Sequence, residues 1–110
     1  MATEQQTLGE FEQMILLAIL QRKEEAYGAT IYDELSRHTR RSVARGAVYM
    51  TLDRLEKKGL LTSSLSEPTA ERGGRAKRCY KATKTALLAL KASRRTLLSL
   101  WDGLDPVLGK

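Results

Sequence analysis

The hydrophobic period of this chain changes twice, at Gly59 and again near Thr83. Up to Gly59 the apolar residues recur every three or four positions, as on one face of a helix. Residues 61–65 and 78–82 instead follow the two-residue alternation of strands. One proline and two adjacent glycines interrupt the segment between them, so we expect two antiparallel strands joined by a long polar loop.

Three helices are expected before this change of period. The first covers Phe11–Leu20, which follows a capping box at Thr7–Glu10 and is apolar nearly all round, so we expect burial on several sides. The second covers about residues 27–37 and the third about residues 44–58, with Gly59 placed to end it. The apolar stripe of the third helix consists of Val48, Leu52 and Leu55.

A fourth helix is expected to begin near Thr83, whose hydroxyl can cap it. It should end at Asp105-Pro106, since proline cannot continue a helix. Six of its residues follow the spacing 3, 4, 3, 4, 3 of a coiled-coil seam. They are Leu87, Leu90, Arg94, Leu97, Trp101 and Leu104. This seam predicts a dimerisation helix.

The positive charge is concentrated in two blocks of the chain. The formal net charge is +6. Residues 1–35 carry a net charge of −5, whereas residues 36–58 carry +5 and residues 67–84 carry +4. A localised positive field attracts polyanions, of which DNA and RNA are the commonest. From charge alone, a solvated basic surface is the alternative interpretation.

Several classes of protein do not fit this composition. The chain has one cysteine, Cys79, and one histidine, His38, which are too few for an intramolecular disulfide or a zinc site. Its longest apolar run is the seven residues Met14–Leu20, far short of the roughly 20 needed to cross a membrane. No catalytic triad, paired carboxylates or glycine-rich phosphate loop is recognisable. We expect a cytoplasmic protein that is not an enzyme and has no metal or cofactor.

The order helix, helix, helix, strand, loop, strand, helix is that of a winged helix-turn-helix. The expected fold class is therefore mainly α with a small β-hairpin, followed by a C-terminal dimerisation helix. In this architecture the third helix enters the major groove, and the hairpin loop lies along the backbone or in the minor groove. Both basic blocks fall on these elements, which favours DNA. We expect a DNA-binding domain at residues 1–82 and a dimerisation helix with its tail at residues 83–110.

Three stretches of the chain are more specific together than any one of them alone. They are Gly46-Ala47-Val48-Tyr49, Leu52-Asp53-Arg54-Leu55-Glu56-Lys57-Lys58-Gly59-Leu60-Leu61 and Arg78-Cys79-Tyr80-Lys81-Ala82-Thr83. Together with Ala26-Tyr27-Gly28 and Leu8–Leu20, they resemble the PadR family of bacterial transcriptional regulators over roughly residues 8–104. The single short C-terminal helix resembles the shorter subfamily. The resemblance implies a homodimer that binds double-stranded operator DNA, usually as a repressor.

The chain departs from the PadR pattern on the surface expected to read bases. The family usually has Ser or Thr where this chain has Ala44, and Gly where it has Ala86. It often has Thr in place of Ala47 and Pro in place of Met50. These departures alter the base-reading surface without threatening the fold.

Third-helix residues opposite the apolar stripe are the candidates for contact with DNA. Ala47 and Met50 are placed to touch a thymine methyl group, and Arg45 and Arg54 to reach guanine or phosphate. Solvated surface charge is the alternative role for an arginine such as Arg54. The resemblance implies that Tyr49 donates to phosphate, with half-buried packing as its alternative role.

The remaining charged candidates lie on or beside the expected wing loop. Arg72, Arg75, Lys77 and Arg78 lie on or beside it, and in the functional interpretation the wing arginines enter the minor groove. They can also be solvated loop side chains in the free protein, and both descriptions can hold at once. On the third helix, Asp53 would repel phosphate, so we expect it to pair with Lys57 one turn further on.

Trp101, Leu97 and Phe11 are the candidates for a ligand site at a dimer interface. Trp101 is the only tryptophan and lies on the seam, where a two-fold axis could bring two copies close together. Its first interpretation is packing in the dimer core. The other is one wall of a flat hydrophobic site, which resembles the multidrug-sensing members of the family and implies a small hydrophobic effector. Arg94 interrupts the seam, where it sets the register, binds an anion or extends to solvent.

Two other functions compete with operator binding. A dimerising winged-helix module could present its basic face to an acidic protein, and a structured RNA could take the place of DNA. The wing favours DNA, since an adaptor needs no arginines beside Gly73-Gly74.

Overall fold

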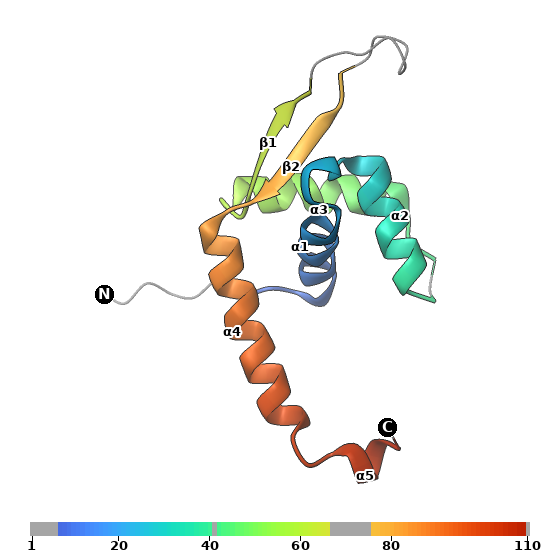
Figure 1. Cartoon of the computed structure of the whole chain (residues 1–110), viewed down its shortest axis with the longest axis vertical. Helices are drawn as coiled ribbons and strands as arrows, with labels where there is room; N and C mark the ends of the chain where they lie inside the picture. Colours follow the sequence, from blue (N-terminus) through green and yellow to red (C-terminus); the bar gives the residue numbers. More distant parts are fainter. Residues whose placement is uncertain (1–6, 41, 67–75, 110) are drawn as a thin grey trace, which may run out of the picture.

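The computed structural model describes residues 7–40, 42–66 and 76–109 of the 110-residue chain. In chain order the elements are α1 (Glu10–Arg22), the short 3-10 helix η1 (Lys23–Glu25), α2 (Gly28–His38), α3 (Arg45–Lys57), β1 (Leu61–Leu65), β2 (Arg78–Ala82), α4 (Lys84–Trp101) and α5 (Asp105–Leu108). Figure 1 shows α1, α2 and α3 gathered in one unit, with the β1–β2 hairpin rising from one side and α4 leading away on the other. The expected fold class, mainly α with a small β-hairpin, is confirmed.

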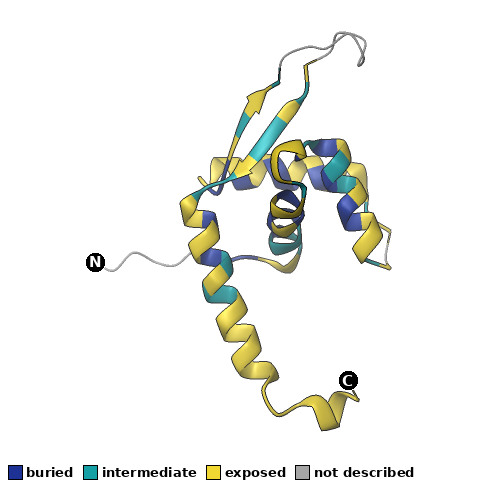
Figure 2. Ribbon diagram, in the orientation of Figure 1, coloured by how far each residue is buried: buried dark blue, intermediate teal, exposed yellow. Residues whose placement is uncertain are grey.

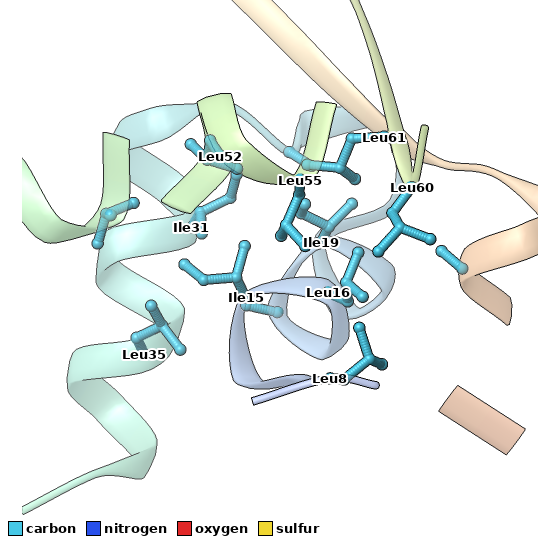
Figure 3. Close-up of a cluster of buried hydrophobic side chains, with 14 of the residues drawn as sticks. Leu8, Ile15, Leu16, Ile19, Ile31, Leu35, Leu52, Leu55, Leu60 and Leu61 are labelled. Carbon is cyan, nitrogen blue, oxygen red and sulfur yellow. The ribbon is translucent and has the colours of Figure 1, made fainter. Parts of the chain in front are cut away.

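The three N-terminal helices share one hydrophobic core, shown in Figure 3. Its main buried side chains come from the inner face of each helix, and they are Ile15, Leu16 and Ile19 of α1, Ile31 and Leu35 of α2, and Val48, Leu52 and Leu55 of α3. The α3 stripe is therefore buried as its spacing predicts. Burying one such side chain stabilises the fold by about 1.5–3 kcal/mol, so α3 is held with one face inward and the other outward.

The chain leaves α3 through a tight turn that starts the hairpin. Gly59 has a φ of +80°, which glycine adopts without strain. Its N–H donates to the Glu56 carbonyl at 3.0 Å. The Leu60 N–H donates to the Leu55 carbonyl at 2.9 Å, which completes a Schellman ending. The turn brings Leu60 and Leu61 into the core, so the predicted role of Gly59 is confirmed.

The hairpin is antiparallel, as the alternation predicts, and it is fastened to the helices at its base. Its register places Leu61 opposite Ala82. The Tyr80 N–H donates to the Ala26 carbonyl at 2.8 Å, in the segment between η1 and α2. Tyr27 and Cys79 form an isolated antiparallel bridge beside this bond. The wing therefore has a fixed orientation relative to the start of α2.

The start of α1 differs from expectation. The helix begins after Gly9, and the Gly9 N–H donates to the Glu12 Oε1 at 3.0 Å. The predicted capping box at Thr7–Glu10 is therefore wrong. Glu12 instead completes the cap, three positions after Gly9, and its other carboxylate oxygen accepts from Arg54 and Lys58.

The end of α4 also differs from expectation. The Thr83 hydroxyl caps the start of the helix, accepting from the Ala86 N–H at 3.2 Å, as predicted. The helix ends at Trp101, however, and Gly103 turns the chain with a φ of +78°. Pro106 lies in the first turn of α5 instead of stopping α4, because a missing N–H costs nothing at a helix start. Leu104 is therefore outside α4.

Two helices, α1 and α4, expose apolar side chains, and the ribbon of α4 is mostly coloured as exposed (yellow) in Figure 2. On α1, Ile15, Leu16 and Ile19 are buried, in line with the expected burial on several sides, whereas Leu17 and Leu20 are 49% and 40% exposed. On α4, Ala86 and Ala89 are buried, and every residue from Arg94 onward is exposed. The exposed large apolar residues of α4 are Leu87, Leu88, Leu97, Leu98, Leu100 and Trp101.

Candidate nucleic-acid interface

The outward face of α3 is apolar at its centre. Ala47 and Met50 are exposed, Met50 by 69% of its surface. Asp53 and Lys57 form the expected ion pair one turn apart, at 3.2 Å between Oδ2 and Nζ. Because these two charges offset each other, methyl and thioether groups dominate the centre of this face.

Arg45 and Tyr49 both lean from α3 onto α2. The Arg45 guanidinium lies over the Tyr32 ring, 4.2 Å from its centroid, which is cation–π distance. The Tyr49 side chain is 50% exposed, and its hydroxyl end occupies the space where a Cβ on Gly28 would stand. Gly28 thus permits the close approach of the two helices. The packing role predicted for Tyr49 is visible here, and its phosphate-binding role stays a prediction.

Arg54 is turned toward α1 more than the α3 periodicity suggests. Its Nε donates to Glu12 Oε2 at 3.2 Å, and its Nη2 lies 3.5 Å from the Thr51 hydroxyl. The Lys58 Nζ donates to the same Glu12 oxygen at 2.9 Å. The Arg54 side chain is nevertheless 51% exposed, so one side of the guanidinium still faces solvent.

The carboxylate that holds these cations was not among the sequence candidates. Glu12 is only 6% exposed. Burial by itself raises the pKa of this carboxyl, but hydrogen bonds from Lys58, the Gly9 N–H and Arg54 outweigh it and hold the pKa below its ordinary value of 4.5. Glu12 is therefore ionised at neutral pH. An acidic residue inside an apolar helical run was the one sequence signal that could have identified it.

A cleft lies between the base of the wing and the helices. The Lys77 Nζ is 4.3 Å from the centroid of the Tyr27 ring, and the Arg78 Nη1 donates to the Ser63 hydroxyl at 2.9 Å. Burial raises the pKa of the Tyr80 hydroxyl above its ordinary value of 10.0, so it remains a donor at neutral pH. The residues that line the cleft are Tyr27, Gly28, Ala29, Tyr49, Lys77, Arg78 and Tyr80.

This cleft joins predicted and unpredicted residues. Tyr49 and Lys77 were candidates, and the fold brings them to one cleft, Tyr49 from α3 and Lys77 from the position directly before β2. The sequence placed Arg78 beside the wing loop, whereas Tyr80 was missed as a site residue because strand alternation indicates which face a residue takes but not what that face meets. Arg72 and Arg75, the other wing candidates, lie outside the described residues.

The candidate ligand residues do not gather within one chain. Trp101 and Leu97 are 53% and 45% exposed near the end of α4, whereas Phe11 packs against the core at the start of α1. Figure 1 shows the end of α4 well away from α1. Among the described residues, no helix is long and apolar enough to span a membrane. The same residues include no group of three or more His, Cys, Asp or Glu side chains placed to hold a metal ion.

The family of the chain follows from residues 16–91, which match the model of the transcriptional regulator PadR-like family. The chain belongs to the PadR-like family. The resemblance read from the sequence is thus confirmed, and the family is one of transcriptional regulators rather than of enzymes.

Individual PadR-like relatives support the assignment. The chain is 45% identical over 76 residues to Transcriptional regulator Rv3488 of Mycobacterium tuberculosis, a match that spans 69% of this chain and 66% of that protein. A PadR-like regulator of Bacillus cereus has a TM-score of 0.73 and 25% identity, covering 91% of this chain and 92% of that one. A PadR family regulator of Clostridium difficile shares the fold with a TM-score of 0.72 and 23% identity, covering 89% of this chain and 98% of that one.

Proposed function

We propose that this PadR-like protein is a dimeric DNA-binding regulator that binds an inverted-repeat operator and represses transcription. The observation that carries the proposal is the cleft at the base of the wing. The recognition helix α3 and the wing are the two elements that contact DNA in this architecture. In this chain they border one cleft that contains Lys77, Arg78 and the hydroxyl groups of tyrosines.

The contacts divide into positioning and reading. In our proposal Arg45, Tyr49 and Lys77 contact phosphates, which fix the register of the protein on the duplex. The exposed methyl and thioether groups of Ala47 and Met50 meet thymine methyl groups in the major groove. Arg54 reaches a base edge or a phosphate from the flank of α3.

The dimer part of the proposal rests on apolar surface. Large apolar side chains are exposed along α4, where they include several leucines and Trp101, and on α1 at Leu17 and Leu20. Apolar surface gathered in this way is typical of an interface between proteins. We propose that α4 of a second copy covers the exposed apolar residues of both α4 and α1. A two-fold axis through this contact would present two α3 helices to half-sites roughly one helical turn apart.

This function is tested by selecting bound sequences from a random DNA pool. Mobility shifts then measure affinity, and light scattering measures the oligomeric state. The proposal expects an inverted repeat to be enriched, bound by a dimer, with a salt slope of about −0.9 for each neutralised phosphate. Replacing Arg72 and Arg75 by alanine should weaken all sequences alike and flatten the slope. Equal binding of unrelated duplexes would refute the operator. Preference for structured RNA, or for an acidic protein, would support the alternatives instead.

A small hydrophobic effector is a further component of the proposal. It rests on Trp101, which leaves a large aromatic surface half exposed near the end of α4. Titration with flat cationic dyes, followed by tryptophan fluorescence, should quench Trp101 and lower DNA affinity together. Unchanged fluorescence and unchanged affinity would leave Trp101 with a packing role alone.

A further inference from the structure

We propose that Glu12 of α1 is a positioning residue for DNA binding, which holds Arg54 of α3 and Lys58, the residue directly after α3, and thereby sets how selectively the protein binds its operator. The inference rests on the DNA-binding function proposed above. Glu12 itself touches no DNA in this proposal, and it acts through the two cations.

Glu12 accepts hydrogen bonds from three residues in two distant parts of the chain. Its Oε1 accepts the Gly9 N–H at 3.0 Å, which caps α1. Its Oε2 accepts both the Lys58 Nζ at 2.9 Å and the Arg54 Nε at 3.2 Å. These bonds link residues 42 and 46 positions apart in the chain, so one side chain joins the start of α1 to the last turns of α3.

The charge balance explains why such a junction matters for DNA. Two cations converge on one buried carboxylate, so the cluster carries a net charge of +1 instead of +2. Arg54 is held through Nε by Glu12 and through Nη2 by the Thr51 hydroxyl, while half of its side chain remains exposed, so the guanidinium is oriented and is still partly open to solvent. A cation held in one rotamer loses less entropy on binding and discriminates better between targets than a free one.

The same turn of α1 also contacts α4. Gln13, the neighbour of Glu12, accepts a hydrogen bond from the Ser93 hydroxyl at 2.9 Å. One residue therefore holds the recognition helix and the next holds the proposed dimerisation helix. Because half-site spacing depends on how α3 is set relative to the dimer axis, a loosened Glu12 junction should reduce discrimination between operators.

Glu12→Gln is the direct test, because it keeps the side-chain shape and an oxygen that can accept the Gly9 N–H. It removes the negative charge that attracts Arg54 and Lys58, so that their charge becomes available to DNA phosphates. The salt slope of binding to non-specific duplex should become steeper, by up to about 0.9 for one added phosphate contact. The ratio of operator to non-specific affinity should fall about tenfold, the value of one good base contact.

Glu34→Gln is the matched control. Glu34 is also a buried carboxylate, 8% exposed, and it also holds cations, with Arg22 Nε on Oε1 and His38 Nε2 on Oε2, both at 2.9 Å. Its ion-pair partners Arg22, Arg37 and His38 lie on α1 and α2 and not on α3. Glu34→Gln should therefore lower the melting temperature without steepening the non-specific salt slope or changing the affinity ratio.

Two further variants tie the effect to Arg54. In an Arg54→Gln background, adding Glu12→Gln should change the affinity ratio much less than it does in the native protein, as coupled residues in a double-mutant cycle require. Glu12→Asp, which keeps the charge, should recover part of the selectivity, and it serves as the test if Glu12→Gln does not fold.

The outcomes separate the two proposals. If the native protein selects an operator but Glu12→Gln matches Glu34→Gln in salt slope and affinity ratio, Glu12 is a structural residue and only this inference fails. If the native protein binds no DNA selectively, the proposed function fails first and the positioning role falls with it.

Discussion

Two buried glutamates organise the ion pairs of this small fold. Glu12 joins α1 to α3 through Arg54 and Lys58, and Glu34 joins α2 to α1 through Arg22. In each case one carboxylate serves more than one cation, because a charge inside the fold must be compensated from several directions. Tyr49 also connects two helices, because its hydroxyl end lies against Gly28 of α2.

The ion pairs predict acid sensitivity. The pKa values of Glu12 and Glu34 both lie below the ordinary 4.5, so the folded state binds fewer protons than the unfolded chain. Their stabilisation is complete above the unfolded-state pKa and is lost as the pH falls through the folded-state values. Urea unfolding from pH 7 to pH 3 should show Glu12→Gln destabilised by about 1–2 kcal/mol at neutral pH, with the half-exposed Arg54 limiting the loss. A difference in unfolding free energy between the native protein and Glu12→Gln that does not narrow as the pH falls below 4.5 would contradict the linkage.

Gly28→Ala tests the close approach at the cleft. The added Cβ would overlap the hydroxyl end of Tyr49, which must swing outward, while alanine favours the helix by about 0.5–1 kcal/mol over glycine. We expect little loss of thermal stability but weaker DNA binding, measured by fluorescence anisotropy. Tyr49→Ala provides the control, since Gly28→Ala should add no further loss in that background. A large additional loss there would mean that Gly28 acts independently of Tyr49.

At the scale of elements, α3 and α4 differ in how they are held against the core. α3 buries the Val48 stripe and turns its other face outward, so its position is set by the core. α4 contacts the helical unit through its first half, where Ala86 and Ala89 are buried and Ser93 donates to Gln13 of α1, whereas its residues from Arg94 onward are exposed. A helix of this kind gains most of its stability from packing against a partner rather than from propensity.

Leu97→Asp tests the role of the α4 seam. A carboxylate at this position would be buried by the proposed dimer, at a cost that a single chain does not bear. We expect the variant to be monomeric or unfolded, as measured by light scattering and circular dichroism. Leu88→Asp is the control, because Leu88 is on the same helix, 56% exposed against 45% for Leu97, and off the seam. Equal dissociation by both variants would argue against the seam.

At the scale of the whole molecule, the parts proposed to bind DNA and to dimerise lie on different sides. The wing rises from one side of the helical unit and α4 leaves from the other, as Figure 1 shows. The first turn of α1 lies between them, since its residues bond to α3 through Glu12 and to α4 through Gln13. We expect substitutions in this turn to reduce the ratio of operator to non-specific affinity more than substitutions at equally buried residues elsewhere.

The sequence by itself determined the elements, their order and the family. Helical spacing gave the buried stripe of α3, alternation predicted the hairpin, and Gly59 marked the turn between them, because each of these signals is local. The Asp53–Lys57 pair was predictable for the same reason, since residues four apart on a helix are neighbours. The fold class followed from this order without any knowledge of distant contacts.

Only the tertiary structure decided what the charged and aromatic side chains meet. The partners of Arg54 and Tyr49, at Glu12 and Gly28, lie in other helices, and no local period encodes them. The same is true of Lys58, which also meets Glu12, whereas the bond from Gly9 to Glu12 that caps α1 is local. At the end of α4, a proline was compatible with either stopping one helix or starting another. The left-handed turn at Gly103 decided between them, because it places Pro106 in a first turn where no N–H is needed.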